Sequence, residues 1–407
     1  MNHDQNRPPR LRLLMAFALV VTGIGSPAVA ADTAPGSGPI IDLRYRHEAV
    51  DDAAFTRNAN ADTVRLRLGY RWVFASAWQI RVDGEHVQGL FGQHYNSTAN
   101  GKTTYPVVAD PESSELNQAW IGYSGEQWQS RLGRQQVMLD NQRFFGNVGW
   151  RQNEQTFDAL FAGHTFSGGG PTIGYTYLDR ALRVFGHDNP NPLLGEWSLS
   201  GNLIHAEQAL PFGSLSAYAY LVENNSIATL STRTLGLRWT GKHPLGDNTL
   251  GWALEWSDQS DYANNPLSQS ARYHLIEPSL QIRGLTIKAG WEVLGGNGRY
   301  GFSTPYATLH AFNGWADRFL STPVDGLDDR YFGLSGKIGQ SGRVSWSTTY
   351  HDFRADQGGD AYGHEFDASI GYRFNARFSG LLKAADYHSD GYGSDVRKLW
   401  ASVEYRY

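Results

Sequence analysis

The links between the predicted strands of this chain alternate in length. The sequence contains eighteen runs in which apolar and polar residues alternate. Eight links are short, near 74–77, 125–127, 166–170, 207–213, 242–248, 283–284, 339–341 and 375–376. The nine links between them are longer, near 49–62, 88–114, 136–154, 180–195, 223–229, 259–268, 295–327, 354–362 and 388–396. Outer-membrane barrels sort their connections in this way, because every neighbouring pair of strands is antiparallel. The pattern predicts an all-β transmembrane antiparallel barrel of 18 strands, with short periplasmic turns, long extracellular loops and both termini in the periplasm.

The last predicted strand, 397–407 (RKLWASVEYRY), shows the alternation most clearly. Leu399, Ala401 and Val403 share one parity, whereas Trp400 and Ser402 share the other. Successive side chains of a strand point to opposite faces, so one face is apolar. The strand also resembles the C-terminal insertion signal of bacterial outer-membrane proteins. An open sheet edge in hydrocarbon leaves backbone groups unpaired, so we expect the first and last strands to pair and close the wall.

The N-terminal segment has the order of an export signal. Arg7, Arg10 and Arg12 precede an apolar stretch at 13–21, and small residues follow at 28–30. This order predicts a signal peptide over 1–30, which leaves 31–407 as a single barrel domain. No internal run of 18 apolar residues occurs, which excludes helical membrane spans. The chain has no cysteine, which fits an exported protein that needs no disulfides. Its net charge of -5 argues against a nucleic-acid partner.

The polar parity of the first five strands is rich in arginine. A barrel of this size is too wide for side chains to fill, so this parity is predicted to line a water-filled channel. The residues are Arg44, Arg46, Arg65, Arg67, Arg71, Arg81 and Arg131. Guanidinium groups recognise carboxylates, so the row favours a path for anions. The alternative is a set of structural ion pairs with Asp42, Glu48, Asp83 and Glu85.

Three links, 88–114, 136–154 and 295–327, are longer than a turn requires. Long ordered loops of this kind can fold inward and narrow a porin channel. The last contains TLHAFNGWADRFL at 308–320, which is too apolar for a solvated loop and alternates poorly. We expect this segment to be a short helical or irregular piece that enters the barrel mouth; the alternative is a cap on the rim.

Three motifs resemble the alginate export family of outer-membrane porins. They are GRQ at 133–135, WRQNEQTFDA at 150–159 and TPYATLHAFNGWADRFLSTPVDG at 304–326. The resemblance implies an 18-stranded monomeric barrel that passes an anionic uronate polysaccharide such as alginate through an arginine-lined pore. It also implies that residues in or beside these motifs shape the constriction: Arg134, Arg143, Arg151, Asp158, His310, Asn313, Trp315, Asp317 and Arg318. In our register Arg134 has lipid-facing parity, which requires a bulge or an earlier strand end.

Other functions remain open at this stage. The chain is shorter than the well-known alginate exporter and net acidic, so uptake of small organic solutes is the alternative transport function. A barrel-borne lipid-modifying or hydrolytic enzyme would need a serine, a histidine and an acid together, for which Ser345, Ser347, His351 and Asp352 are candidates. His351 and His364 are candidate metal ligands at loose spacing. We predict no catalytic residue, no cofactor and no metal. The expected partners are outer-membrane lipid and an anionic saccharide or small organic solute.

Overall fold

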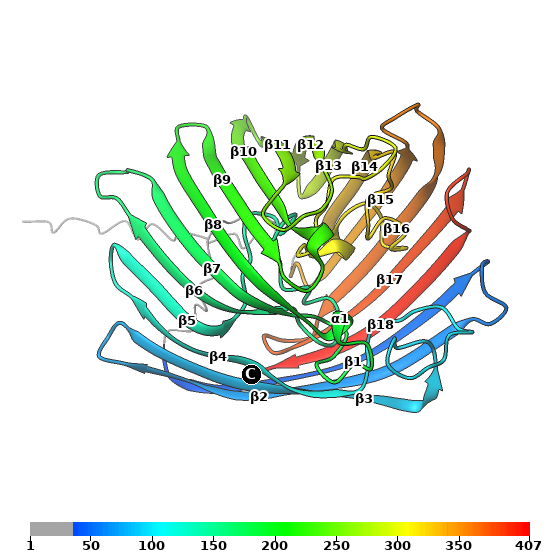
Figure 1. Cartoon of the computed structure of the whole chain (residues 1–407), viewed down its shortest axis with the longest axis horizontal. Coiled ribbons are helices and arrows are strands. Elements are labelled where there is room, and N and C mark those ends of the chain that lie inside the picture. The colour runs from blue at the N-terminus through cyan, green and yellow to red at the C-terminus, as the bar shows by residue number, and fades with distance from the viewer. Residues whose placement is uncertain (1–35, 340) are drawn as a thin grey trace, which may run out of the picture.

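The computed structural model describes residues 36–339 and 341–407, which form eighteen antiparallel strands around one interior (Figure 1). The predicted signal peptide lies outside the described residues. The strands are β1 (Gly38–Asp52), β2 (Ala59–Phe74), β3 (Trp78–His94), β4 (Ser113–Ser124), β5 (Trp128–Gln135), β6 (Thr156–Thr165), β7 (Thr172–Leu182), β8 (Glu196–Leu210), β9 (Gly213–Asn224), β10 (Thr232–Leu245), β11 (Asn248–Asp261), β12 (Ser270–Ile282), β13 (Leu285–Leu294), β14 (Leu327–Ile338), β15 (Val344–Arg354), β16 (Ala361–Arg373), β17 (Phe378–Ser389) and β18 (Val396–Arg406).

The wall closes by pairing its first strand with its last. β1 and β18 are antiparallel neighbours, with a register that runs from Asp42 opposite Arg406 to Asp52 opposite Val396 (Figure 1). Closure therefore satisfies the backbone groups that an open edge would leave unpaired in lipid. The predicted barrel of 18 strands is confirmed. The strands extend further than predicted in places, so the first external link is only 53–58 instead of 49–62.

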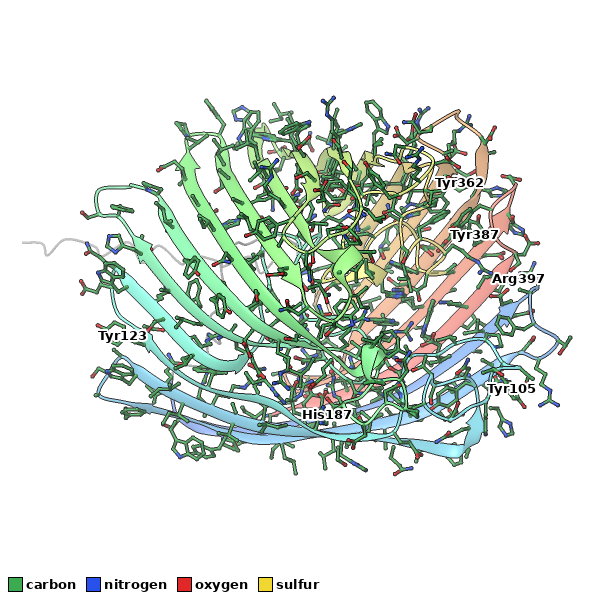
Figure 2. The ribbon with its side chains drawn as sticks, viewed as in Figure 1. Tyr105, Tyr123, His187, Tyr362, Tyr387 and Arg397 are labelled. Carbon is green, nitrogen blue, oxygen red and sulfur yellow. The ribbon has the colours of Figure 1, made fainter. Side chains whose placement is uncertain are left out.

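The outer face of the wall is apolar at every second residue. On β2, for example, Leu66 and Leu68 are exposed, whereas the neighbouring Arg65 and Arg67 are buried. Aromatic side chains are exposed beside the tight turns, as Trp72, Trp78 and Trp128 show, which is the girdle expected at a membrane interface. Figure 2 places Tyr123, next to a tight turn, and Tyr105, in a long link, at opposite ends of the molecule.

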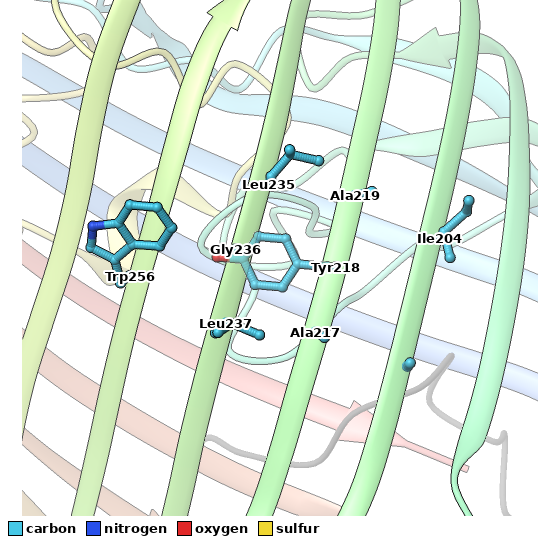
Figure 3. Close-up of a pocket in the computed structure, with 9 residues that line it drawn as sticks. Ile204, Ala217, Tyr218, Ala219, Leu235, Gly236, Leu237 and Trp256 are labelled. Carbon is cyan, nitrogen blue, oxygen red and sulfur yellow. The ribbon is translucent and has the colours of Figure 1, made fainter.

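A shallow apolar hollow lies on the outer face between β8 and β11 (Figure 3). Its rim is formed by the exposed Ile204, Leu235, Leu237 and Trp256. Its floor is formed by small residues, among them Gly236, over which the ring of Tyr218 packs from the lumen. The hollow follows from these small side chains and faces the same side as the lipid-facing residues.

The 136–155 loop and the 295–326 loop fold into the barrel instead of out into solvent (Figure 1). Their aromatic rings pack on each other: Phe145 stacks on Tyr306 with ring centroids 5.4 Å apart, and Phe144 packs against Phe302 at 5.9 Å. Complete burial of one such ring stabilises the packed loops by about 1.5–3 kcal/mol. The prediction that these loops enter the lumen therefore agrees with the structure.

Helices are short in the described residues. α1 (Pro192–Gly195) lies in the link between β7 and β8, and two 3-10 turns, η1 (Ala228–Leu230) and η2 (Leu309–Ala311), lie in later links. No helix among the described residues has the length and apolar character needed to cross a membrane. The turn η2 is part of the predicted 308–320 segment, which is irregular on both sides of it, as expected.

Candidate functional site

The lumen wall of β1, β2 and β3 carries arginines directly opposite one another. In the register of the sheet, Arg44 lies directly opposite Arg65, and Arg71 lies directly opposite Arg81. Both pairs have the inward parity predicted from the sequence. Like charges in directly opposed positions destabilise a sheet, so each pair requires compensation from other groups.

Carboxylates supply part of that compensation. Arg65 forms ion pairs with Asp42 at 2.6 Å and with Glu404 at 3.3 Å. Arg67 pairs with Glu85 at 2.7 Å. Arg81 pairs in the same way with Asp83 at 2.6 Å, and Arg46 pairs with Glu48 and Asp110. These contacts favour the ion-pair interpretation for four of the seven predicted wall arginines.

The other compensation comes from the 136–155 loop. Arg44 donates to the carbonyl oxygens of Gly149 at 3.0 Å and Arg151 at 2.5 Å, and to the side chain of Gln152 at 3.1 Å. Arg46 donates to the carbonyl of Trp150. The wall arginines therefore also hold a loop segment in the lumen, a role that the sequence analysis did not assign to them.

Two predicted lumenal arginines lie nearer the periplasmic end of their strands. Arg71 donates to the backbone oxygen of Gly36 at 3.2 Å. The guanidinium carbon of Arg131 lies 4.2 Å from the centre of the Trp120 ring. Together with Arg81, they place guanidinium groups on the lumen wall below the contacts of the 136–155 loop.

The tip of the 295–326 loop is held by inward carboxylates of the opposite wall. Asn313 donates to Glu292 at 2.7 Å and to Asp329 at 3.0 Å. The backbone amides of Trp315 and Ala316 donate to Asp367 at 3.2 Å and Glu365 at 2.7 Å. The turn between them is made by Gly314, which has a φ of 82°. A loop docked by four hydrogen bonds to buried carboxylates is an ordered part of the lumen.

Arg143 joins the two loops. Its guanidinium group pairs with Glu292 of β13 at 2.9 Å and donates to the Asn313 side chain at 3.0 Å. Arg143 is almost completely buried. Because removal of one partner of a buried ion pair leaves an uncompensated charge, this contact is a strong constraint on the position of both loops.

A second junction surrounds Asp317. Its carboxylate pairs with Arg151 of the other loop at 3.2 Å, with Lys398 of β18 at 2.7 Å, and with His310 at 2.6 Å. Burial alone would raise the pKa of Asp317, but His310, Lys398 and Arg151 hold it well below 3.8. Burial lowers the pKa of His310 to about 3, so its imidazole is neutral. The next residue, Arg318, pairs with Asp52 of β1 at 2.9 Å.

Two predicted site residues lie elsewhere. Arg134 and Asp158 form an ion pair at 2.8 Å, with the strand parity of the exposed Leu132 and Leu160. They therefore lie on the outward side of the wall and do not join the constriction, contrary to the expectation from the motifs. The lipid-facing parity assigned to Arg134 is the parity that the structure shows. Asp158 also lies 3.7 Å from Arg180, so the pair belongs to a charged group at the external end of β5–β7.

The structure adds residues that the sequence analysis did not select. Lys383 and Lys398 point inward from β17 and β18, and Asp329 points inward from β14. Their inward parity was readable from the alternation of each strand. Their importance was not, because it depends on which loop enters the lumen and which wall it meets.

The residues considered for catalysis or metal binding have other contacts. The hydroxyl groups of Ser347 and Ser369 lie 2.8 Å apart, and His351 lies 2.9 Å from Asp329. His364 contacts Asp390 at 3.2 Å and has the outward parity of Phe366, so it does not face His351. Within 36–339 and 341–407, no group of three or more His, Cys, Asp or Glu residues has a metal-binding arrangement.

A closed barrel with an apolar outer face and ordered loops in its lumen defines an outer-membrane channel of the porin class. Residues 40–168 match the model of a family described as alginate export, which confirms the resemblance for the motifs at 133–135 and 150–159; the motif at 304–326 lies outside the match. No curated protein sequence matches this chain.

Solved porin structures share the fold at low sequence identity. A BenF-like porin from Pseudomonas fluorescens Pf-5 is 14% identical, with a TM-score of 0.73 over 91% of this chain and 98% of that chain. OpdL from Pseudomonas aeruginosa is 17% identical, with a TM-score of 0.69 over 91% and 98% of the two chains. OccK2 (OpdF) from P. aeruginosa, solved in complex with glucuronate, is 14% identical, with a TM-score of 0.69 over 91% and 96%.

Proposed function

We propose that this outer-membrane channel passes small anionic solutes of about the size and charge of a monomeric uronate. The directly opposed arginine pairs on the lumen wall, Arg44 with Arg65 and Arg71 with Arg81, carry this proposal. Carboxylates and loop carbonyls compensate Arg44, Arg65 and Arg81 in this structure, and a permeating carboxylate offers guanidinium groups the same kind of acceptor oxygen. An arginine-rich wall therefore favours a path for anions, since fixed cations lower the energy of an anion in a narrow pore.

The loops favour a small solute over a polymer. The 136–155 and 295–326 loops are joined by the Arg143–Asn313 hydrogen bond and the Arg151–Asp317 ion pair, which are buried or partly buried. A polysaccharide would have to pass these docked loops along its whole length, whereas a single sugar acid would pass them once. Among the solved relatives in fold, OccK2 (OpdF) was crystallised with glucuronate and OpdK with vanillate. Both of those ligands are small carboxylates.

The second candidate is passage of a uronate polysaccharide such as alginate. The match of residues 40–168 to the alginate export family favours it. This candidate requires the two loops to leave the lumen or to move against the wall during transport. It therefore differs from the first candidate in the length of the solute that enters the channel.

Ion selectivity in a planar bilayer tests the charge of the permeating solute. Under a KCl gradient, the wild-type channel should give a reversal potential that indicates anion preference. The double variant R71Q/R81Q should lose much of that preference because two lumen charges are removed. The matched control is R330Q/R354Q, which removes two arginines of outward parity, each paired with an aspartate two residues away. Cation preference in the wild type, or an equal effect of both double variants, would refute the proposal.

Solute length is tested with the same preparation. Glucuronate added to one side should reduce the chloride current and carry current itself. Uronate oligomers should block from one side without crossing. Passage of oligomers at a rate similar to that of the monomer would replace the first candidate with the second.

A further inference from the structure

Lys383 of β17 lies at the point where both lumen loops meet the wall. Its side chain is inward and almost completely buried. Three indole rings from three different elements surround its amino group. The nitrogen lies 3.6 Å from the ring centre of Trp315, 4.3 Å from that of Trp150 and 5.3 Å from that of Trp400. Trp315 belongs to the 295–326 loop, Trp150 to the 136–155 loop and Trp400 to β18.

The fourth neighbour of this amino group is His310. The Lys383 nitrogen lies 2.6 Å from Nε2 of His310, whose Nδ1 lies 2.6 Å from the Asp317 carboxylate. Because an ionised carboxylate only accepts hydrogen bonds, Nδ1 carries the proton and donates it to Asp317. Nε2 is then the acceptor for the ammonium group of Lys383. The imidazole also stacks on Trp150, with centroids 4.7 Å apart and ring planes 7° apart.

The three cations at this junction, Arg151, Lys398 and Lys383, contact different kinds of group. Arg151 and Lys398 each contact the carboxylate of Asp317. Lys383 instead contacts aromatic faces and one imidazole nitrogen. A buried ammonium group attracts the negative face of an aromatic ring, and the attraction is strongest for tryptophan and for a desolvated cation. The charge of Lys383 therefore draws Trp150 and Trp315 toward the same point from two separate loops.

We propose that Lys383 is a positioning residue for the channel constriction: its ammonium group holds the 136–155 loop and the 295–326 loop together against β17 and β18. Without it, the two loops lose one of the contacts that they share at this wall, and the Arg151–Asp317 pair remains. The loops then leave the docked position more often, and the pore widens each time. This inference rests on the channel function proposed above, and it concerns the width of the channel instead of its selectivity.

The test compares single-channel recordings of the full chain with Lys383 replaced in two ways. K383M removes the ammonium group and keeps a long apolar side chain, whereas K383R keeps a cation that stacks on indole rings. K383M should show openings to a larger conductance about thirtyfold more often than wild type, the ratio that a desolvated cation–π contact of this class supplies. K383R should restore most of the wild-type behaviour. The control is K288M, which removes a lumen lysine that is paired with Glu277 away from the loops.

Amide hydrogen exchange gives a second measurement on the same variants. In K383M the amides of Trp315 and Ala316 should exchange faster, because their hydrogen bonds to Asp367 and Glu365 exist only while the loop is docked. Exchange in the strands should stay unchanged, which shows that the barrel is intact. If K383M does not insert into membranes, K383Q provides the same loss of charge with a polar side chain.

The outcomes separate this inference from the proposed function. Wild-type conductance and wild-type exchange in K383M would overturn the inference, even if the channel prefers anions. Faster exchange and larger openings in K383M would support it, even if the wild type shows no anion preference. An equal effect of K288M would also overturn it, because the effect would then follow from any lost lumen charge.

Discussion

Arg151 and Asp317 form an ion pair at 3.2 Å between two loops that are separated in sequence by eight of the eighteen strands, β6 to β13. Arg151 also pairs with Glu48 of β1 at 3.0 Å. The pair therefore ties the first lumen loop to the second and both to the wall. Since each loop depends on the other for this contact, we expect the two loops to dock cooperatively.

The substitution D317N should release the 295–326 loop. It leaves Arg151 and Lys398 as buried cations without their shared carboxylate, and breaking such an arrangement costs about 3–5 kcal/mol. Hydrogen exchange of the loop amides should rise by several orders of magnitude while strand amides stay protected. The control D325N changes an exposed aspartate of the same loop and should have no such effect. Equal exchange in both variants would contradict the central position of Asp317.

Acid should weaken loop docking. His310 has a pKa of about 3 in the docked loop and about 6.5 when exposed, so a released loop binds a proton that a docked loop does not. Docking is therefore complete above about pH 6.5 and weakens by up to about 1.4 kcal/mol per pH unit as the pH falls toward 3. The low pKa of Asp317 acts in the same direction, because its contribution is present above its ordinary value of 3.8 and is lost as the pH falls further.

Recordings between pH 7 and pH 4 test this dependence. Larger or noisier openings should become more frequent as the pH falls. The variant H310Q keeps an acceptor for Lys383 but does not titrate, so its recordings should change less over this range. A pH profile of H310Q that equals the wild-type profile would assign the effect to another group.

The glycine at 314 should be sensitive to a single methyl group. Gly314 has a φ of 82°, and a Cβ there would lie 2.3 Å from a carboxylate oxygen of Glu365. The variant G314A should therefore displace the amides of the loop tip and increase their exchange. G298A is the matched control, because Gly298 has a φ of 81° in the same loop but the nearest atom to its Cβ is 3.6 Å away. The strain of the backbone is the same in both, so a larger effect at 314 isolates the contact with Glu365.

Adjacent residues of β16 should differ sharply in their tolerance of charge. Ile370 is 45% exposed on the lipid-facing side, whereas Ser369 points inward and contacts Ser347. An arginine on the lipid face costs about 2–4 kcal/mol at the bilayer midplane, and less near the interfaces. I370R should therefore reduce folding into lipid vesicles, as followed by the shift of the folded barrel in gel electrophoresis. S369R should fold normally; the reverse order would mean that the two faces are assigned incorrectly.

Much of the barrel was predictable from the sequence because the alternation that assigns each side chain to a face involves neighbouring residues. Alternation along each strand determines which residues face lipid, and Leu66 beside Arg65 shows that the two faces can be read from neighbouring positions. The number of strands follows from counting runs and links. The paired closure of β1 and β18 follows from the cost of an open edge in a membrane.

The interior was predictable only in part, because its contacts join residues that are far apart in the chain. The sequence offered Arg44 and Arg46 as wall arginines, but not their hydrogen bonds to Gly149, Arg151 and Trp150. Lys383 was not distinguished from other inward residues until two loops were seen to meet there. Arg134 was placed in the constriction on the strength of its motif, although its parity pointed outward.

The most direct test of the account is the bi-ionic reversal potential with chloride on one side of the bilayer and glucuronate on the other. We predict a potential that corresponds to substantial glucuronate permeability, reduced in R71Q/R81Q and unchanged in R330Q/R354Q. A channel that carries potassium in preference to both anions, or that excludes glucuronate while it passes chloride freely, would contradict the account.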